Sequence, residues 1–171
     1  MKDVVLLYDN CCIYEIVILN YFLKATSSNL VFCSVNGGNI MAMEGYSIRT
    51  EVALEDIHLS QVRSFIIPGG DISNIDYDIV YNSLKILCNS GALIAGICAG
   101  TDILEKAGLL KDVSSSKQEE FDCVRDGNII TARANAYVDF AIETAKALDL
   151  FEDEEDLQET IAFWKEFKRA L

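Results

Sequence analysis

Histidine is nearly absent from this sequence: one occurs among 171 residues, alongside a single proline and a single tryptophan. Because histidine commonly accompanies cysteine as a zinc ligand, its scarcity argues against a metal site. Basic residues are also few, since 14 Lys and Arg stand against 27 Asp and Glu and give a formal net charge of −13. Such a surface repels phosphate backbones and anionic lipid headgroups, so neither nucleic acid nor a membrane surface is an expected partner.

Long apolar runs are missing as well. No segment is apolar over the length needed to cross a bilayer, and the start of the chain, MKDV, lacks the arrangement of a signal peptide. The sequence passes at once into a short apolar strand pattern. We therefore expect a cytoplasmic protein.

The cysteines form no CxxC pair and are too sparse for a small secreted scaffold held by disulfides. We expect reduced thiols, most of them packed as small hydrophobic side chains. With one histidine as the sole companion ligand, we expect neither a metal nor another cofactor. The six positions are Cys11, Cys12, Cys33, Cys88, Cys98 and Cys123.

A hydrophobic fraction of 51% in 171 residues predicts one domain over residues 1–171 that buries a substantial core. Apolar runs that resemble buried strands alternate with segments of helical periodicity. We expect strands at 3–8, 30–35, 64–67, 91–97 and 128–132, helices at 13–25, 76–89, 101–107, 137–148 and 153–171, and hairpin or edge strands within 40–53.

Strands that are apolar on both faces and separated by helices are typical of a parallel sheet between two helix layers. The sequence therefore predicts an α/β fold, a three-layer α/β/α sandwich around a mostly parallel sheet. Ligands of such sheets bind beyond the carboxyl ends of the strands. Three loops at those ends carry unusual residues: DNCCIYE at 9–15, PGGD at 68–71 and GICAG at 96–100.

The GICAG loop fits the nucleophile-elbow pattern, with Cys98 as the nucleophile. Flanking glycines let the backbone turn sharply and project the sulfur into the crevice. The start of the next helix should favour the thiolate and lower the pKa of Cys98. On this pattern alone, a packed cysteine at a tight strand–helix turn is an equally good interpretation.

Three segments, IIPGGD (66–71), AGICAGTDIL (95–104) and DGNIITARANAYVDFAIETAKAL (126–148), together resemble the ThiJ/PfpI superfamily, which includes the parkinsonism-associated protein deglycase. The resemblance covers the chain from VVLLYDNCCIYE to about Leu148. It implies a flavodoxin-like fold of the class I glutamine amidotransferase type, a reactive elbow cysteine at Cys98, an acidic partner at Glu15 and a backbone N–H donor at Gly70. It also implies a homodimer.

Glu15 has two interpretations. It is either a solvated carboxylate at a helix start or a crevice residue beside Cys98. A carboxylate and a thiolate in contact repel each other, so in the crevice the two groups should share one proton, with the carboxyl donating to sulfur. Gly70 and Ala99 are candidate N–H donors for an oxyanion or a cysteine sulfinate, and the alternative is that they are ordinary turn and helix-start residues.

The sequence departs from the family pattern at its histidines. Many members carry a histidine near the cysteine, and Ser116 lies approximately at that position; protease-type relatives carry one directly after the cysteine, at Ala99 here. We expect the only histidine, His58, to lie on the surface at the opposite edge of the sheet. No Cys–His pair is then available, which argues against a peptidase.

Two functions fit the same site. Cys98 either adds to a small electrophile, as in relatives that act on glyoxals or isonitriles, while Glu15 moves a proton, or it is oxidised to sulfenic or sulfinic acid as a redox sensor. A catalytically silent family member is a third interpretation. The expected partner is a small electrophile or oxidant. Candidate rim residues are Cys11, Cys12, Thr101, Ser116 and Arg133.

Two further hypotheses concern segments beside this site. Cys11 or Cys12 is either a resolving thiol for oxidised Cys98 or an ordinary loop residue. The amphipathic segment 153–171, acidic early and basic late, should form a helix that docks on the domain or on a second copy of the chain.

Overall fold

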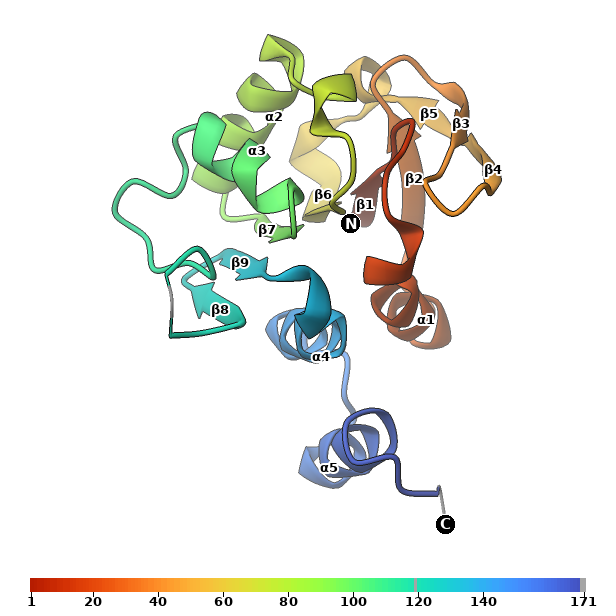
Figure 1. The fold of residues 1–171 in the computed structure, drawn as a ribbon, viewed down its shortest axis with the longest axis vertical. Helices are drawn as coiled ribbons and strands as arrows, with labels where there is room; N and C mark the ends of the chain where they lie inside the picture. Colours follow the sequence, from red (N-terminus) through yellow and green to blue (C-terminus); the bar gives the residue numbers. More distant parts are fainter. Residues whose placement is uncertain (119, 170–171) are drawn as a thin grey trace.

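A seven-stranded sheet with helices on both faces forms the centre of the computed structural model, which describes residues 1–118 and 120–169 (Figure 1). The strand order is β5-β2-β1-β6-β7-β9-β8, and neighbours are parallel except for β8, which runs antiparallel to β9. This confirms the predicted mostly parallel α/β fold. The strands are β1 (Lys2–Leu6), β2 (Leu30–Ser34), β5 (Val52–Ala53), β6 (Val62–Ile67), β7 (Leu93–Ile97), β8 (Cys123–Asp126) and β9 (Ile129–Ala132).

The helices cover the sheet in two layers. α1 contacts α4 on one face, and α2 contacts α3 on the other (Figure 1). Each helix buries one apolar stripe; in α2, Val80, Leu84 and Leu87 recur at the helical spacing and are fully buried. The helices of these layers are α1 (Val17–Ala25), α2 (Asp78–Asn89), α3 (Gly100–Lys106) and α4 (Tyr137–Ala147).

The order of the parallel strands positions the crevice. Taken along the chain, these strands follow the flavodoxin-like order, and the direction of winding reverses between β1 and β6. The loops after β1, β6 and β7 meet at the carboxyl ends of these strands. They are the loops that the sequence singled out.

Three elements differ from the predicted boundaries. The helix expected at 13–25 begins as a 3-10 turn, Ile13–Glu15, before α1. The expected edge strands include a separate hairpin of β3 (Gly38–Met41) and β4 (Ser47–Thr50), whose tip bonds to the loop after β1. The short strand β8 was not predicted, because only four residues form it and two of them are charged and exposed.

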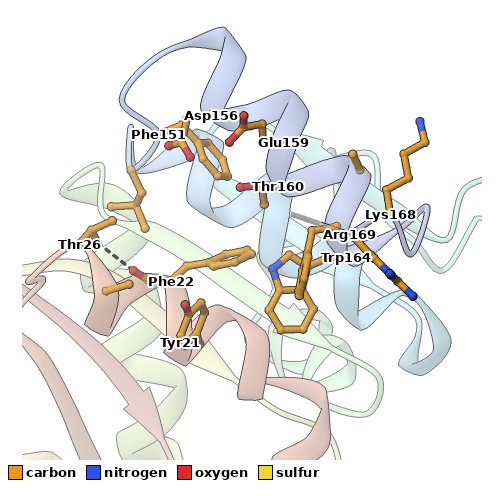
Figure 2. A pocket seen from close by; sticks show the side chains of 14 residues that line it. Tyr21, Phe22, Thr26, Phe151, Asp156, Glu159, Thr160, Trp164, Lys168 and Arg169 are labelled. Atoms are coloured by element: carbon orange, nitrogen blue, oxygen red, sulfur yellow. Dashed lines mark hydrogen bonds between the residues drawn. The ribbon is translucent and has the colours of Figure 1, made fainter. Parts of the chain in front are cut away.

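The last helix, α5 (Glu154–Trp164), packs on α1. It ends earlier than expected, and residues 170 and 171 of the predicted helix lie outside the described part of the chain. The Trp164 ring lies 6.1 Å from both the Tyr21 and Phe22 rings, centroid to centroid. Figure 2 shows the resulting aromatic cavity of about 610 Å³ between the two helices. Of the two docking alternatives, the described structure therefore shows α5 on its own domain.

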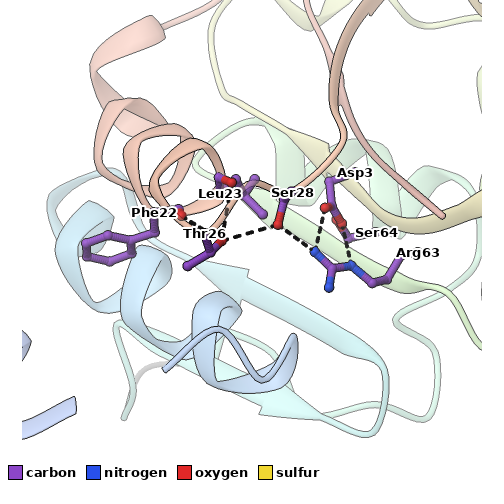
Figure 3. Close-up of polar contacts among 7 residues, drawn as sticks. All are labelled: Asp3, Phe22, Leu23, Thr26, Ser28, Arg63 and Ser64. Carbon is purple, nitrogen blue, oxygen red and sulfur yellow. Dashed lines mark hydrogen bonds and ion pairs between the residues drawn. The ribbon is translucent and has the colours of Figure 1, made fainter. Parts of the chain in front are cut away.

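A buried ion pair anchors the opposite, amino ends of the central strands (Figure 3). Asp3 is fully buried and accepts two hydrogen bonds from Arg63, at 3.0 and 2.6 Å, and one from Ser64 at 2.7 Å. Arg63 also donates to Ser28 at 2.9 Å. Because Asp3 is enclosed by donors and lies away from the crevice, we assign it a structural role that ties β1 to β6.

Candidate active site

Cys98 occupies the turn between β7 and α3 in a left-handed backbone conformation, with φ of +55°. That conformation is strained for a residue with a side chain and is held by neighbours. The Cys98 N–H donates to the carbonyl of Ala132 at 2.8 Å, and its carbonyl accepts the N–H of Thr101 at 3.0 Å. Both bonds fix the elbow between the ends of β7 and β9, with its sulfur half-buried.

The glycine after the elbow is required for close packing rather than for its dihedral freedom. A Cβ on Gly100 would lie 2.3 Å from the carbonyl oxygen of Ile67 and 2.9 Å from that of Pro68. The backbone of β6 therefore passes directly against the start of α3. The cysteine itself, and not a flanking glycine, adopts the unusual dihedral angle.

Glu15 ends the 3-10 turn after β1, and only 1% of its surface is exposed. Its Oε2 accepts the Gly69 N–H at 2.6 Å, and its Oε1 accepts the Tyr14 hydroxyl at 3.3 Å. The carboxyl and the Cys98 sulfur border the same glycine, because a Cβ on Gly69 would lie 2.8 Å from Glu15 Oε2 and 2.9 Å from Cys98 Sγ. The structure thus places Glu15 in the crevice rather than in solvent.

The protonation of this pair differs from the sequence expectation for the thiol. Burial raises the pKa of Cys98, the charge of Glu15 raises it further, and the Ala99 N–H acts in the opposite direction. Burial likewise raises the pKa of Glu15, although the Gly69 N–H favours its ionised form. Burial and the charge of Glu15 therefore outweigh the effect of the α3 start on the pKa of Cys98. We expect the carboxyl and the sulfur to hold one proton between them, because this relieves the repulsion between their two negative charges.

The raised pKa of Glu15 has a consequence for stability. A carboxyl whose pKa is higher in the folded protein than in the unfolded chain stabilises less as the pH rises through the folded value. The Glu15→Gln variant loses that dependence, so its stability relative to wild type should increase as the pH rises above the ordinary pKa of a glutamate. Urea unfolding across this range measures it.

Glu55→Gln, which alters an exposed carboxylate in a 3-10 turn remote from the crevice, is the control for that measurement. The rise in relative stability with pH should be specific to Glu15→Gln. An equal rise in Glu55→Gln, or no rise in Glu15→Gln, would contradict the burial effect.

A pocket of about 360 Å³ opens beside the thiol. Three of the predicted rim residues, Thr101, Ser116 and Arg133, line it together with Cys98. Asp102 and Lys117, which sequence reasoning missed, also line it and form an ion pair at 2.7 Å. Arg133 donates to the Ser116 carbonyl at 3.3 Å, so this cation is bound to the opposite wall of the pocket.

The Pro-Gly-Gly turn supplies a backbone donor to Glu15, and the donor role expected of Gly70 beside Cys98 stays a prediction. The Gly69 N–H reaches Glu15, while Gly70 forms a bridge with Cys11. A Cβ on Gly70 would lie 2.1 Å from the Asn10 carbonyl oxygen, so this glycine allows two loops to cross. Gly69 is packed against the site itself: a Cβ there would lie 2.6 Å from Cys98 Cβ and 2.8 Å from Glu15 Oε2.

The two loop cysteines have different environments. Cys11 is fully buried and therefore is not a rim residue, contrary to expectation. Cys12 is half-buried, donates its N–H to the Gly69 carbonyl at 2.8 Å and directs its thiol to Met43 Sδ at 3.8 Å. Neither is among the residues that line the pocket beside Cys98.

Comparison with known proteins connects this geometry to a family. Residues 1–147 match the sequence profile of the DJ-1/PfpI family. The chain belongs to this family. The profile covers every loop of the crevice, from the 9–15 segment to the end of β9, and the predicted resemblance is thereby confirmed.

Individual DJ-1/PfpI relatives differ in their names. A protein from Bacillus subtilis named as an uncharacterized protease is 32% identical over 150 residues, which span 74% of this chain and 70% of the relative. One from Thermococcus kodakarensis named as a deglycase is 25% identical over 150 residues, 78% of this chain and 90% of that one. A DJ-1 superfamily structure from Agrobacterium tumefaciens superposes with a TM-score of 0.86 at 23% identity, covering 98% of this chain and 100% of the other.

This DJ-1/PfpI chain has no histidine in its crevice. His58 is exposed just before β6, at the amino ends of the parallel strands and therefore opposite the crevice, as the sequence predicted. Ser116 is buried on the pocket wall, where its N–H donates to Thr131 Oγ1 at 2.8 Å. The residue directly after Cys98 is Ala99, whose side chain is a methyl group.

Among residues 1–118 and 120–169, no three His, Cys, Asp or Glu side chains are grouped to hold a metal ion. Nor does any helix formed by these residues have the length and apolar character required to cross a membrane.

Proposed function

We propose that Cys98 and Glu15 act as one unit on a small electrophile, in a glyoxalase- or deglycase-like addition. The observation that carries this proposal is the buried Glu15 carboxyl, which borders the same glycine as the sulfur of a strained elbow cysteine. The deglycase name of one relative at 25% identity supports the same class of substrate. A pocket of about 360 Å³ suits a molecule of a few heavy atoms.

The addition step follows from the shared proton. The Cys98 sulfur bonds to the aldehyde carbon of a 2-oxoaldehyde, and the carbonyl π electrons move to oxygen. The carboxyl proton of Glu15 passes to that oxygen and yields a neutral hemithioacetal, while the Ala99 N–H stabilises the developing negative charge. Glu15 is then ionised and serves as the base for the next proton transfer.

The remaining steps require no external oxidant or reductant. Glu15 takes the C–H proton of the hemithioacetal carbon and returns it to the neighbouring carbonyl carbon. The hydroxyl proton of the hemithioacetal passes to the ketone oxygen, so the first carbon becomes the thioester carbonyl and the second carries the hydroxyl group. Water cleaves the thioester to a 2-hydroxy acid and restores the thiol. An isonitrile carbon is an alternative electrophile for the same sulfur, with Glu15 supplying the proton.

Peptide hydrolysis is not proposed, although one relative carries a protease name. The leaving amine of a peptide requires a proton from a general acid near the scissile bond, a task that histidine performs in cysteine peptidases. The only histidine here, His58, is exposed just before β6, away from the carboxyl ends of the strands.

Oxidation of Cys98 is a second candidate function, supported by the environment of its sulfur. The sulfur is half-buried, near the Ala99 N–H and the Glu15 carboxyl, and both groups can donate to a sulfenate or sulfinate oxygen. A redox sensor would use the same two residues without turnover.

Incubation of the purified, reduced protein with methylglyoxal tests the primary proposal. We expect lactate to form over many turnovers per protein. No turnover of methylglyoxal together with selective oxidation of Cys98 by hydrogen peroxide would favour the sensor. Reactivity of Cys98 no greater than that of a free thiol toward both reagents would contradict both functions and leave the silent interpretation.

A further inference from the structure

Cys12 and Cys98 come from different loops and border the same residue of the candidate active site, Gly69. Both cysteines contact the same residue: Cys12 donates its N–H to the Gly69 carbonyl at 2.8 Å, and a Cβ on Gly69 would lie 2.9 Å from Cys98 Sγ. The charge of Cys98 also contributes to the pKa of Cys12. Cys12 thus borders this glycine through its backbone, and Cys98 borders it through its side chain.

Exposure distinguishes Cys12 from the other cysteines near the crevice. Cys11 has no exposed surface and lies beneath the crossing of the two loops, whereas Cys12 is half-buried. The Cys12 thiol currently points to Met43 Sδ, 3.8 Å away, on the exposed tip of the β3–β4 hairpin. A thiol–thioether contact is weak, so rotation of Cys12 toward Cys98 costs little.

We propose that Cys12 is the resolving thiol that captures Cys98 after its oxidation, an inference that rests on the proposed reactivity of Cys98. A hydroperoxide first converts the Cys98 thiol to a sulfenic acid and is itself reduced to an alcohol or water. The Cys12 sulfur then bonds to Cys98 sulfur, the S–O bond breaks, and the Cys12 proton leaves with the hydroxide as water. The resulting disulfide prevents further oxidation to the sulfinic acid.

The rate of capture should depend on pH. Burial and the charges of Glu15, Glu44, Cys98 and Cys11 raise the pKa of Cys12 to about 11. Because the thiolate is the attacking species, the capture rate should rise about tenfold for each pH unit near neutrality. Glu44→Gln removes one of these charges and keeps the side-chain oxygen that accepts the Tyr14 N–H at 2.8 Å, so it should accelerate capture.

The test is treatment of the whole, reduced protein with hydrogen peroxide in the presence of dimedone, which traps sulfenic acids. Wild type and the matched control Cys11→Ser should form an intramolecular disulfide and little dimedone adduct. Cys12→Ser should form no such disulfide and accumulate the adduct or the sulfinic acid at Cys98. Tryptic peptide 3–24 carries Cys11 and Cys12 and peptide 86–106 carries Cys88 and Cys98, so a Cys88→Ser background assigns the bond.

Equal adduct in wild type and Cys12→Ser, or a disulfide that persists in Cys12→Ser, would overturn the inference. So would a Cys98 that peroxide leaves unmodified in Cys12→Ser. Methylglyoxal turnover by untreated protein is measured separately. Disulfide formation without turnover contradicts only the proposed enzymatic function, and turnover without the disulfide contradicts only the resolving role.

Discussion

Serine in place of Cys98 abolishes methylglyoxal turnover, and glutamine in place of Glu15 lowers kcat by about a hundredfold or more. The serine hydroxyl has a far higher pKa than a thiol, so it supplies no nucleophile at neutral pH. Glutamine matches the shape of Glu15 and can still accept the Gly69 N–H, but it neither gives nor takes a proton. Steady-state lactate production measures both variants.

The matched control is Cys88→Ser, which removes a half-buried thiol near the end of α2. It should retain the wild-type kcat. Residual turnover in Cys98→Ser, or a kcat for Glu15→Gln within a few-fold of wild type, would contradict the assigned roles. A change in KM alone would indicate that Glu15 binds substrate without moving a proton.

Alanine at position 69 should remove most activity while the fold persists. Its Cβ would lie 2.6 Å from Cys98 Cβ, 2.8 Å from Glu15 Oε2 and 2.9 Å from Cys98 Sγ, so the two side chains must separate. A displacement of about 1 Å at reacting groups costs on the order of a hundredfold in rate. The measurement is kcat, together with circular dichroism to establish that the sheet is intact.

Gly91→Ala is the control for general destabilisation. Gly91 lies before β7 with φ of +82°, and a Cβ there would meet no atom within 4 Å. The variant should lose stability through backbone strain, by about 1 kcal/mol, and keep its kcat. If Gly69→Ala and Gly91→Ala lost activity to the same extent, general destabilisation would explain the loss in Gly69→Ala, and the expected separation of Cys98 and Glu15 would be contradicted.

Much of this fold could be predicted because its central strands are short, mostly apolar runs separated by segments of helical periodicity. β6 and β7 are apolar on both faces and end in the Pro-Gly-Gly and elbow sequences, so the crevice followed from the rule for parallel sheets. The position of Glu15 followed from the family resemblance. Strand β8 could not be predicted, because a short, half-exposed edge strand is stabilised by its pairing with β9 rather than by its own pattern.

The finer chemistry depended on packing that a sequence does not display. Gly69 and Gly70 are neighbours of the same type, and the crossing of two loops decides which amide faces Glu15. Likewise Cys11 and Cys12 are adjacent, yet one is fully buried and the other half-exposed. The pKa of Cys98 depends on the balance between burial, the charge of Glu15 and the Ala99 N–H, which only coordinates reveal.

The central claim is that Cys98 and Glu15 share one proton, and the pH dependence of Cys98 alkylation by iodoacetamide tests it most directly. In a Cys88→Ser background, peptide 86–106 contains one thiol, and its labelling rate reports the Cys98 thiolate. Wild type should lose its protons in two coupled steps. Glu15→Gln should show a single step, at a lower pH than the second step of wild type. Superimposable curves for the two proteins would contradict the account.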